Sequence, residues 1–329
     1  RKTLCYNTGH DRDHQVGKGG SRMERRYDLV IIGAGPAGMS AAIYGSRAGL
    51  QVAMLEMGAP GGKLVKTNEI SNWPGTIETN GAKLASDMFE HSTAFGAEYL
   101  YGNVIKVEDA GDYKKVICDD GEVYEAKAVI VATGTQERMM KIPGDAENIG
   151  RGVSYCAVCD GAFFRNQEVC VICGGNSALE EANYLTQFAN RVNIIIRRDV
   201  FRADSIVQKA IRENPKIHVI PKHIPIAVID DGNRVVGLKV RNVDTGIETT
   251  IETHGIFPYI GLDPATSFLA DLPVLNERGY MVVDENCETK VKGIYGAGDV
   301  IEKQLRQVVT ATNDGAIAAQ HAFHVIKGL

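Results

Sequence analysis

The sequence predicts an α/β fold with two similar domains, and three observations support this prediction. The chain has 329 residues, a length that exceeds one ordinary hydrophobic core, and 44% of the residues are hydrophobic. A segment that reads strand, glycine-rich turn, helix and strand occurs twice, so that Ile32 and Ile172, 140 residues apart, end equivalent strands. Apolar strand-like segments also lie between the two copies and near the C-terminus. These features predict two Rossmann-like (three-layer ββα-type) dinucleotide-binding domains, the second inserted into the first.

The first copy has the spacing of a nucleotide-binding turn. A strand over residues 28–32 enters Gly33, Gly35 and Gly38, and a helix and a second strand ending at Glu56 follow. The first glycine permits the tight turn, the second lets backbone N–H groups approach a pyrophosphate, and the third allows close helix packing. The helix N-terminus attracts phosphate, and Glu56 is placed to accept hydrogen bonds from a ribose. The motif does not distinguish FAD from NAD, and a glycine turn without a ligand is the alternative.

The second copy carries basic residues where the first has an acid. A strand over residues 168–172, a turn, a helix to Ala189 and a strand over 192–196 form this unit. We expect a phosphate site at the turn and a 2′-phosphate site after the last strand; the residues concerned are Gly175, Asn176 and Ser177 in the turn, and Arg197, Arg198 and Arg202 after the strand. Guanidinium groups pair with a 2′-phosphate that a carboxylate would repel. The unit therefore predicts NADPH, and a solvated basic strand end is the alternative.

Four of the seven cysteines have a spacing that also suits zinc. Cys156, Cys159, Cys170 and Cys173 spell C-x2-C-x10-C-x2-C, as in a zinc ribbon. Cys170 and Cys173 belong to the apolar strand, however, where residues three apart face opposite sides. We therefore interpret these two as structural residues and expect no metal.

The other two cysteines suit redox chemistry. Cys156 and Cys159 lie in a turn-like segment that fits a helix N-terminus, where a thiolate is stabilised. A C-x-x-C disulfide closes a small ring and can cycle between oxidised and reduced forms. Asp160 follows directly and is placed to relay a proton to a departing thiolate. A static disulfide and a helix-capping role for Asp160 are the alternatives.

Charge and hydropathy exclude other classes. The net charge of −5 argues against a nucleic-acid binder, and no apolar run reaches the ~18 residues of a membrane helix. Residues 1–26 are rich in Lys and Arg and lack the apolar run of a secretory signal, so we expect a disordered or non-native extension.

Eight motifs in order resemble one family. They are the residues 33–38, 61–64, 72–75, 132–134, 156–160, 197–202, 298–300 and 306–308. Over nearly all of residues 27–329 the chain resembles the low-molecular-weight (prokaryotic-type) thioredoxin reductases.

The resemblance implies a cofactor set and a domain division. FAD would be held by residues 27–140 together with 266–329, and NADPH by residues 141–265, which also carry the C-x-x-C loop. The residues implied at the FAD site are Gly33, Gly35, Pro36, Ala37, Gly38, Glu56, Gly62, Leu64, Asn72, Thr133, Gly134, Gly298, Asp299, Arg306, Gln307 and Val308. Segments 141–152 and 258–266 would connect the domains, and rotation about them would alternate between two poses.

The resemblance also implies a mechanism. Hydride would pass from NADPH to the flavin and electrons from there to the disulfide, with Cys159 facing the flavin, Cys156 attacking the disulfide of thioredoxin and Asp160 as acid and base. The family forms homodimers, and we expect a cytoplasmic location.

Three residues depart from the family pattern. Lys63 stands where the family usually has Gln, which we expect to change polarity near the flavin. Cys173 replaces the first glycine of the second turn, and Ile196 replaces a His before the arginines. Cys173 would strain the turn if its φ is positive. Three alternatives therefore stay open: another electron donor such as ferredoxin or reduced flavin, a dithiol oxidase, and a non-catalytic zinc- or nucleotide-binding module.

Overall fold

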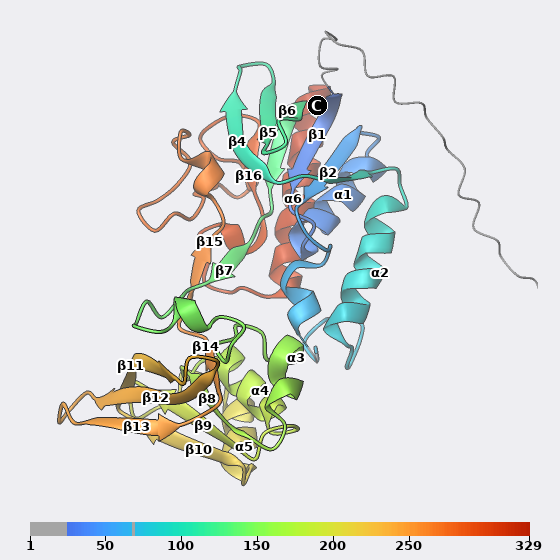
Figure 1. Ribbon diagram of the computed structural model, residues 1–329. Helices are drawn as coiled ribbons and strands as arrows, with labels where there is room; N and C mark the ends of the chain where they lie inside the picture. The colour runs from blue at the N-terminus through green and yellow to red at the C-terminus, as the bar shows by residue number, and fades with distance from the viewer. Residues whose placement is uncertain (1–24, 68–69) are drawn as a thin grey trace, which may run out of the picture.

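The computed structural model describes residues 25–67 and 70–329 (Figure 1). Residues 1–24 of the expected extension lie outside the described residues. Its last two residues do not belong to an extension, because Arg25 and Arg26 pair with Tyr124 and Glu125 at the start of the first strand.

The first sheet has seven strands in the order β3-β2-β1-β6-β5-β4, with β16 also on β6. Their bounds are β1 Arg25–Ile32, β2 Val52–Glu56, β3 Glu98–Tyr101, β4 Val104–Asp109, β5 Lys114–Cys118, β6 Val123–Val131 and β16 Ile294–Gly296. The strands β3, β2, β1, β6 and β16 run parallel, whereas β4 and β5 form an antiparallel arm. The prediction of buried strands around Val129 and Ile294 is thus confirmed.

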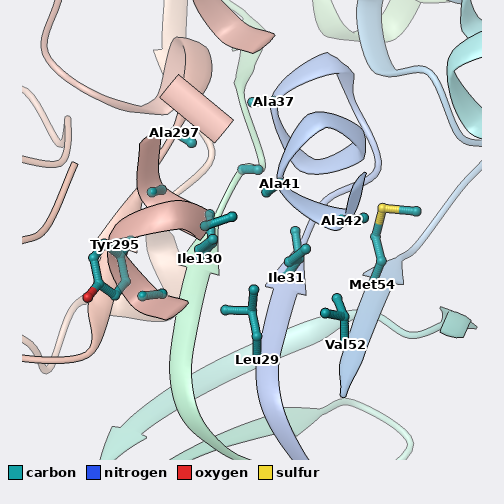
Figure 2. Packing of buried hydrophobic residues seen from close by; sticks show 14 of the residues in the cluster. Leu29, Ile31, Ala37, Ala41, Ala42, Val52, Met54, Ile130, Tyr295 and Ala297 are labelled. Carbon is teal, nitrogen blue, oxygen red and sulfur yellow. The ribbon is translucent and has the colours of Figure 1, made fainter. Parts of the chain in front are cut away.

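Helices cover one face of this sheet. They are α1 (Pro36–Arg47), α2 (Gly81–Thr93) and α6 (Val308–Lys327). Leu29, Ile31 and Ile130 of the central strands are fully buried against alanines of α1 and α6 (Figure 2). The two helices cross closely, since a Cβ on Gly315 of α6 would lie 2.0 Å from the carbonyl oxygen of Ala37. Small residues therefore fix α6 against the helix that follows the first glycine turn.

The second unit repeats this design in a smaller form. Its parallel sheet has the order β10-β9-β8-β14. The bounds are β8 Glu168–Ile172, β9 Arg191–Ile196, β10 Ile217–Pro221 and β14 Gly255–Pro258, with helices α4 Asn176–Leu185 and α5 Ser205–Glu213. The helix α4 ends four residues before the predicted Ala189, which follows a turn at residues 186–188.

A three-stranded antiparallel sheet, β11 (His223–Asp230), β12 (Val235–Asn242) and β13 (Glu248–Glu252), completes the second unit. Cys170 and Ile172 pack with buried residues of β11 and β12, whereas Val169 and Val171 on the same strand pack with those of α4. The parallel sheet therefore lies between a helical layer and a β layer, as the predicted fold class requires.

A short ribbon joins the two units. Strands β7 (Thr135–Glu137) and β15 (Leu262–Pro264) pair antiparallel where the chain leaves and re-enters the first unit (Figure 1). Arg138 forms an ion pair with Asp263 at 2.6 Å across this ribbon. The short helices are η1 Gly62–Lys66, η2 Ala146–Asn148, α3 Ala157–Asp160, η3 Gly161–Phe164, η4 Ser267–Leu269 and η5 Gly298–Val300. No helix in the described part of the chain is long and apolar enough to cross a membrane.

Candidate redox and nucleotide sites

The first glycine turn has the geometry that its motif requires. Gly33 has φ +104°, and a Cβ there would lie 2.5 Å from the carbonyl oxygen of Ala132. A Cβ on Gly38 would lie 1.9 Å from the carbonyl oxygen of Gly33. At Gly35, by contrast, no heavy atom lies within 4 Å of the Cβ position. Glycine is thus required for packing at the outer positions and leaves open space at the middle one.

Free donors and an acid border this open space. Helix α1 begins after Gly35 without a side-chain cap, so its first N–H groups are available to an anion. The Glu56 carboxylate accepts hydrogen bonds from the backbone N–H groups of Ala34 and Gly58, both at 2.9 Å. These bonds hold Glu56 at the strand end beside the turn, where a ribose would lie.

Other residues expected at the FAD site lie around the same sheet edge. Gly62 of η1 approaches the turn, since its Cβ would lie 3.4 Å from Cα of Gly35. Asn72 donates to the side-chain oxygen of Gln307 at 3.0 Å, and the Thr133 hydroxyl donates to the carbonyl oxygen of Ala265 at 2.7 Å. The contacts join segments that are far apart in the sequence, as a discontinuous binding site requires.

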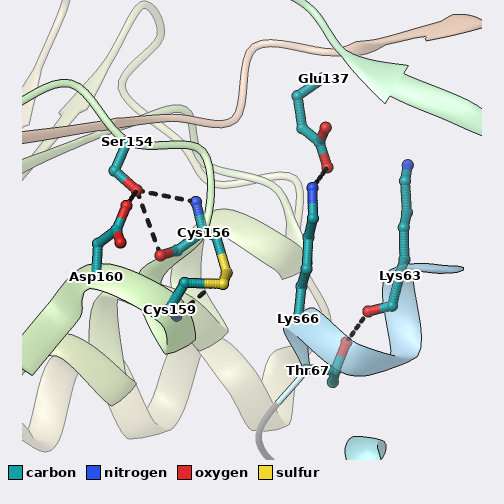
Figure 3. Close-up of a disulfide and its surroundings, with 8 residues drawn as sticks. All are labelled: Lys63, Lys66, Thr67, Glu137, Ser154, Cys156, Cys159 and Asp160. Carbon is teal, nitrogen blue, oxygen red and sulfur yellow. Dashed lines mark hydrogen bonds and ion pairs between the residues drawn. A yellow bond between two sulfur atoms is a disulfide. The ribbon is translucent and has the colours of Figure 1, made fainter. Parts of the chain in front are cut away.

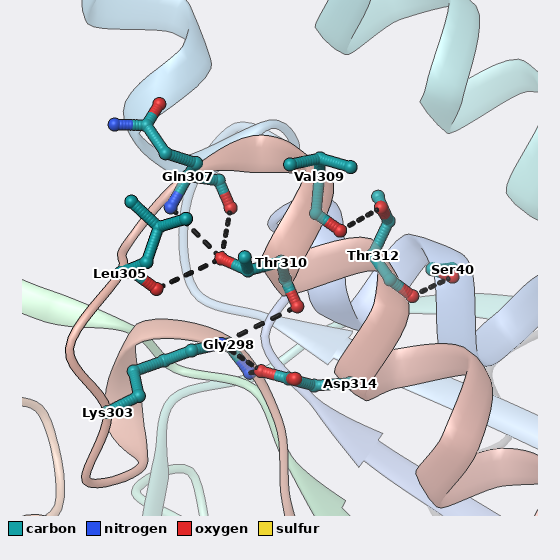
Figure 4. Close-up of polar contacts among 9 residues, drawn as sticks. All are labelled: Ser40, Gly298, Lys303, Leu305, Gln307, Val309, Thr310, Thr312 and Asp314. Carbon is teal, nitrogen blue, oxygen red and sulfur yellow. Dashed lines mark hydrogen bonds and ion pairs between the residues drawn. The ribbon is translucent and has the colours of Figure 1, made fainter. Parts of the chain in front are cut away.

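A buried ion pair supports the segment that holds Asp299. The backbone N–H of Gly298 donates to Asp314 at 3.0 Å, and Lys303 pairs with the same carboxylate (Figure 4). Burial raises the pKa of Asp299, while nearby Lys63 and Arg306 act in the opposite direction. Nε of Arg306 is buried and has no hydrogen-bond partner among the described residues. The guanidinium of Arg306 lies over the ring of Tyr280, 4.7 Å from its centroid, and is close enough to Asp299 to affect its charge. A buried donor without a hydrogen-bond partner in this cluster fits a large anionic cofactor such as FAD.

The second glycine turn is similar in outline. Gly175 also has open space at its Cβ position, and α4 begins after it without a side-chain cap. The N–H of Arg202 donates to the carbonyl oxygen of Gly174 at 2.7 Å, which brings the end of the basic segment back to the turn. Arg197, Arg198 and Arg202 are exposed, and none has an ion-pair partner within the described ranges. The structure therefore places the expected phosphate and 2′-phosphate residues beside one another.

Cys173 adopts the strained conformation that the sequence analysis anticipated. Its φ is +115°, close to the +104° of the equivalent Gly33. A side chain in this region is unfavourable by about 1 kcal/mol or more. Ile196 is the other departure from the family pattern in this unit. It is buried and packs over the turn, since its Cγ2 lies 3.0 Å from a Cβ position on Gly174.

Cys156 and Cys159 form a disulfide at the start of α3 (Figure 3). Cys156 is the N-cap residue, and its sulfur accepts a hydrogen bond from the N–H of Cys159 at 3.1 Å. The hydroxyl of Ser154 donates to Asp160 at 2.6 Å and accepts from the N–H of Cys156 at 3.1 Å. Asp160 makes no capping bond at the helix that follows it, so its alternative role as a helix cap is not realised. Ser154, which the sequence analysis missed, links the acid to the disulfide segment.

The remaining cysteine pair is not arranged as a metal site. Cys170 and Cys173 pack in different hydrophobic clusters on opposite faces of the parallel sheet, as predicted. Burial raises the pKa of Cys170 to about 12. Within residues 25–67 and 70–329, no three His, Cys, Asp or Glu side chains come together as metal ligands.

Comparisons with known proteins agree with this arrangement. Residues 27–315 match the family model for pyridine nucleotide-disulphide oxidoreductases. Thioredoxin reductase of Bacillus subtilis is 46% identical over 306 residues, 93% of this chain and 96% of the relative. The structure resembles thioredoxin reductase of Lactococcus lactis in its FR conformation, with TM-score 0.91 and 46% identity over 92% of this chain and 100% of that one. A thioredoxin reductase of Streptococcus pyogenes, 44% identical over 93% and 100% of the chains, has a TM-score of only 0.63.

Proposed function

Because this chain belongs to the pyridine nucleotide-disulphide oxidoreductase family, we propose that it is a thioredoxin reductase that passes electrons from NADPH through FAD and the Cys156–Cys159 disulfide to oxidised thioredoxin. The observation that carries the proposal is a disulfide at the start of α3, adjacent to η1, the short helix that approaches the open glycine turn (Figure 3). The cofactors are FAD and NADPH. Family membership favours an enzyme over the non-catalytic module that cysteine spacing alone left open.

The first unit would bind FAD, which supplies a carrier that accepts a hydride and passes on two electrons. The N–H groups after Gly35 would bind the pyrophosphate and Glu56 a ribose. The further contacts proposed are Gly33, Pro36, Ala37, Gly38, Gly62, Leu64, Asn72, Thr133, Gly134, Gly298, Asp299, Arg306, Gln307 and Val308. The open space at Gly35 and the buried Nε of Arg306, which has no hydrogen-bond partner among the described residues, support this assignment.

The second unit would bind NADPH. Gly175, Asn176 and Ser177 begin α4 and offer N–H groups to its pyrophosphate. Arg197, Arg198 and Arg202 would bind the 2′-phosphate, because no carboxylate in the described chain already neutralises them. Their location beside the turn supports NADPH as the donor rather than ferredoxin or reduced flavin.

Two electrons supplied through FAD would break the Cys156–Cys159 bond and give two thiolates, which can each take up a proton. The Cys156 thiolate then attacks the disulfide of thioredoxin and forms a mixed disulfide, and Cys159 attacks Cys156 to release reduced thioredoxin. Asp160, hydrogen-bonded to Ser154, would give a proton to the departing thiolate. The oxidised pair is restored for the next cycle.

We further propose domains of residues 27–140 with 266–329 and of residues 141–265, which rotate relative to one another. Two relatives of nearly equal identity differ widely in whole-chain TM-score, which supports more than one domain arrangement within the family. A homodimer and a cytoplasmic location complete the proposal. The free thiols Cys118, Cys170, Cys173 and Cys287 suit a reducing compartment.

Anaerobic spectroscopy of the FAD-loaded protein tests this function. NADPH should bleach the flavin in the parent and in Cys159→Ser, whereas only the parent should reduce thioredoxin. Cys170→Ser is the matched control, since its thiol lies in the core and should leave turnover within about threefold of the parent. Thioredoxin turnover by Cys159→Ser would contradict the assignment, and bleaching by reduced ferredoxin alone would favour the alternative donor. Fast NADPH consumption with oxygen but no thioredoxin turnover would indicate the oxidase.

A further inference from the structure

We propose that Lys63, which has no ion-pair partner among the described residues, places a positive charge beside the flavin and thereby favours its reduced, electron-rich form. This inference rests on the proposed function, because it assigns a role to a residue of the same FAD site. It concerns the charge of Lys63, which the family motif does not supply.

The position of Lys63 brings its ammonium group among the proposed FAD residues. It lies in η1 between Gly62 and Leu64. Its Nζ donates a hydrogen bond to the hydroxyl of Thr135 at 2.6 Å. Thr135 is buried and directly follows Gly134. The side chain therefore reaches from η1 to the end of the segment after β6, which are both parts of the proposed site.

The electrostatic surroundings of Lys63 locate it near the same site. Burial lowers the pKa of Lys63, whereas the charges of Glu137 and Asp299 favour its protonated form, and Lys66 and Arg306 oppose it. Asp299 and Arg306 are both proposed FAD contacts. The Lys63 ammonium is thus one member of a half-buried charge cluster around the proposed cofactor site.

Lys66, one turn later on η1, differs from Lys63 because a nearby carboxylate balances its charge. Its Nζ lies 3.6 Å from a carboxylate oxygen of Glu137 (Figure 3). Within the described residues, Lys63 has no carboxylate at ion-pair distance, and its hydrogen-bond acceptor is a neutral hydroxyl. The positive charge of Lys63 is therefore available to a group that enters the site.

Reduction by hydride adds two electrons and one proton to the flavin, so its ring becomes more negative. A positive charge a few ångströms away in a partly desolvated site shifts such an equilibrium about tenfold or more. The same charge should favour addition of sulfite, which donates its electron pair to the oxidised ring and gives an anionic, bleached adduct. Sulfite affinity therefore measures this charge without turnover.

Sulfite titration of the FAD-loaded protein, followed by flavin absorbance, provides the test. Lys63→Gln removes the charge but keeps a donor, and its dissociation constant for sulfite should rise at least tenfold. Lys63→Arg keeps the charge and should stay within about threefold of the parent. Lys66→Gln, on the same helix, should also stay within about threefold. In NADPH titrations, the equilibrium constant for reduction of the flavin should be tenfold lower in Lys63→Gln than in the parent. This change corresponds to a reduction potential lower by about 30 mV.

Unchanged sulfite affinity in Lys63→Gln would overturn the inference, and so would an equal loss in Lys66→Gln, which would indicate only the overall charge of η1. If Lys63→Gln does not retain FAD, Lys63→Met also removes the charge and keeps a side chain of similar length, and a parental sulfite affinity in that variant would count against the inference. A parent that binds no FAD would instead contradict the proposed function.

Discussion

Glu181, on α4, is a half-buried acid, and one of its two carboxylate oxygens has no hydrogen bond from the described residues. The atom Oε2 of Glu181 and the hydroxyl of Tyr259 are both enclosed, and neither has a hydrogen-bond partner among the described residues. Burial, with a smaller effect of Glu180, raises the pKa of Glu181 to about 7. The folded protein therefore holds a proton that the unfolded chain releases near the ordinary value of 4.5.

This difference gives the free energy of unfolding a definite dependence on pH. Between about pH 4.5 and 7 the folded state binds more protons, so stability falls as pH rises, by roughly 1–3 kcal/mol in total. Glu181→Gln should remove that decline, so that the variant gains stability relative to the parent at pH 8 but not at pH 4.5. Urea unfolding at several pH values measures this, with Glu90→Gln at an exposed position of α2 as control. Equal pH slopes in the parent and Glu181→Gln would refute it.

Single residues could be predicted where backbone geometry dictates them. The glycine spacing indicated a tight turn at residue 33, where φ is +104°. The same alignment predicted strain at Cys173 if its φ is positive, and its φ of +115° meets that condition. Ser154 and the bond from Lys63 to Thr135 were not predicted, because each depends on how distant segments pack. The only signal in the sequence was the position of Ser154, two residues before Cys156.

The end of β9 is the element that should decide between NADPH and NADH. Arg197 and Arg198 follow the strand and are exposed without ion pairs in the described residues. Loss of a charge-assisted contact typically costs about 1.5–3 kcal/mol. We therefore expect Arg197→Ala/Arg198→Ala to raise the KM for NADPH at least tenfold and to leave that for NADH nearly unchanged.

Steady-state kinetics with both nucleotides measures this preference. Arg191→Ala, at the opposite end of the same strand, is the matched control and should keep the parental values. A parent that uses NADH and NADPH equally would show that the arginines are only a solvated strand end.

Elements with strong local patterns were predicted well. The parallel strand β8 has its predicted bounds, and β1, β2 and β9 differ from theirs by at most three residues, because buried parallel strands are continuous apolar runs. The ribbon of β7 and β15 was not predicted, since three-residue strands have too little pattern of their own and depend on their pairing.

At the scale of the molecule, that ribbon is the connection about which the domains would rotate. Gly261 enters β15 with φ +141°, and a Cβ there would lie 3.3 Å from Nη1 of Arg138. Arg138 is the residue that pairs with Asp263 across the ribbon. Gly261 therefore combines a backbone conformation that only glycine adopts easily with a tight contact at the hinge.

Gly261→Ala should consequently slow thioredoxin turnover without removing FAD. Alanine would resist φ +141° and press on Arg138, which hinders movement at the ribbon, and domain movement commonly limits enzymes of this kind. We expect a fall in kcat of roughly three- to tenfold, with the flavin absorbance spectrum and FAD content unchanged. Gly246→Ala is the matched control: Gly246 also has a positive φ, +71°, but lies in the turn between β12 and β13 with open space at its Cβ position. It should lose some stability and keep its turnover. If both variants turn over at the parental rate, the ribbon is not the hinge, and rotation must use residues 141–152 instead.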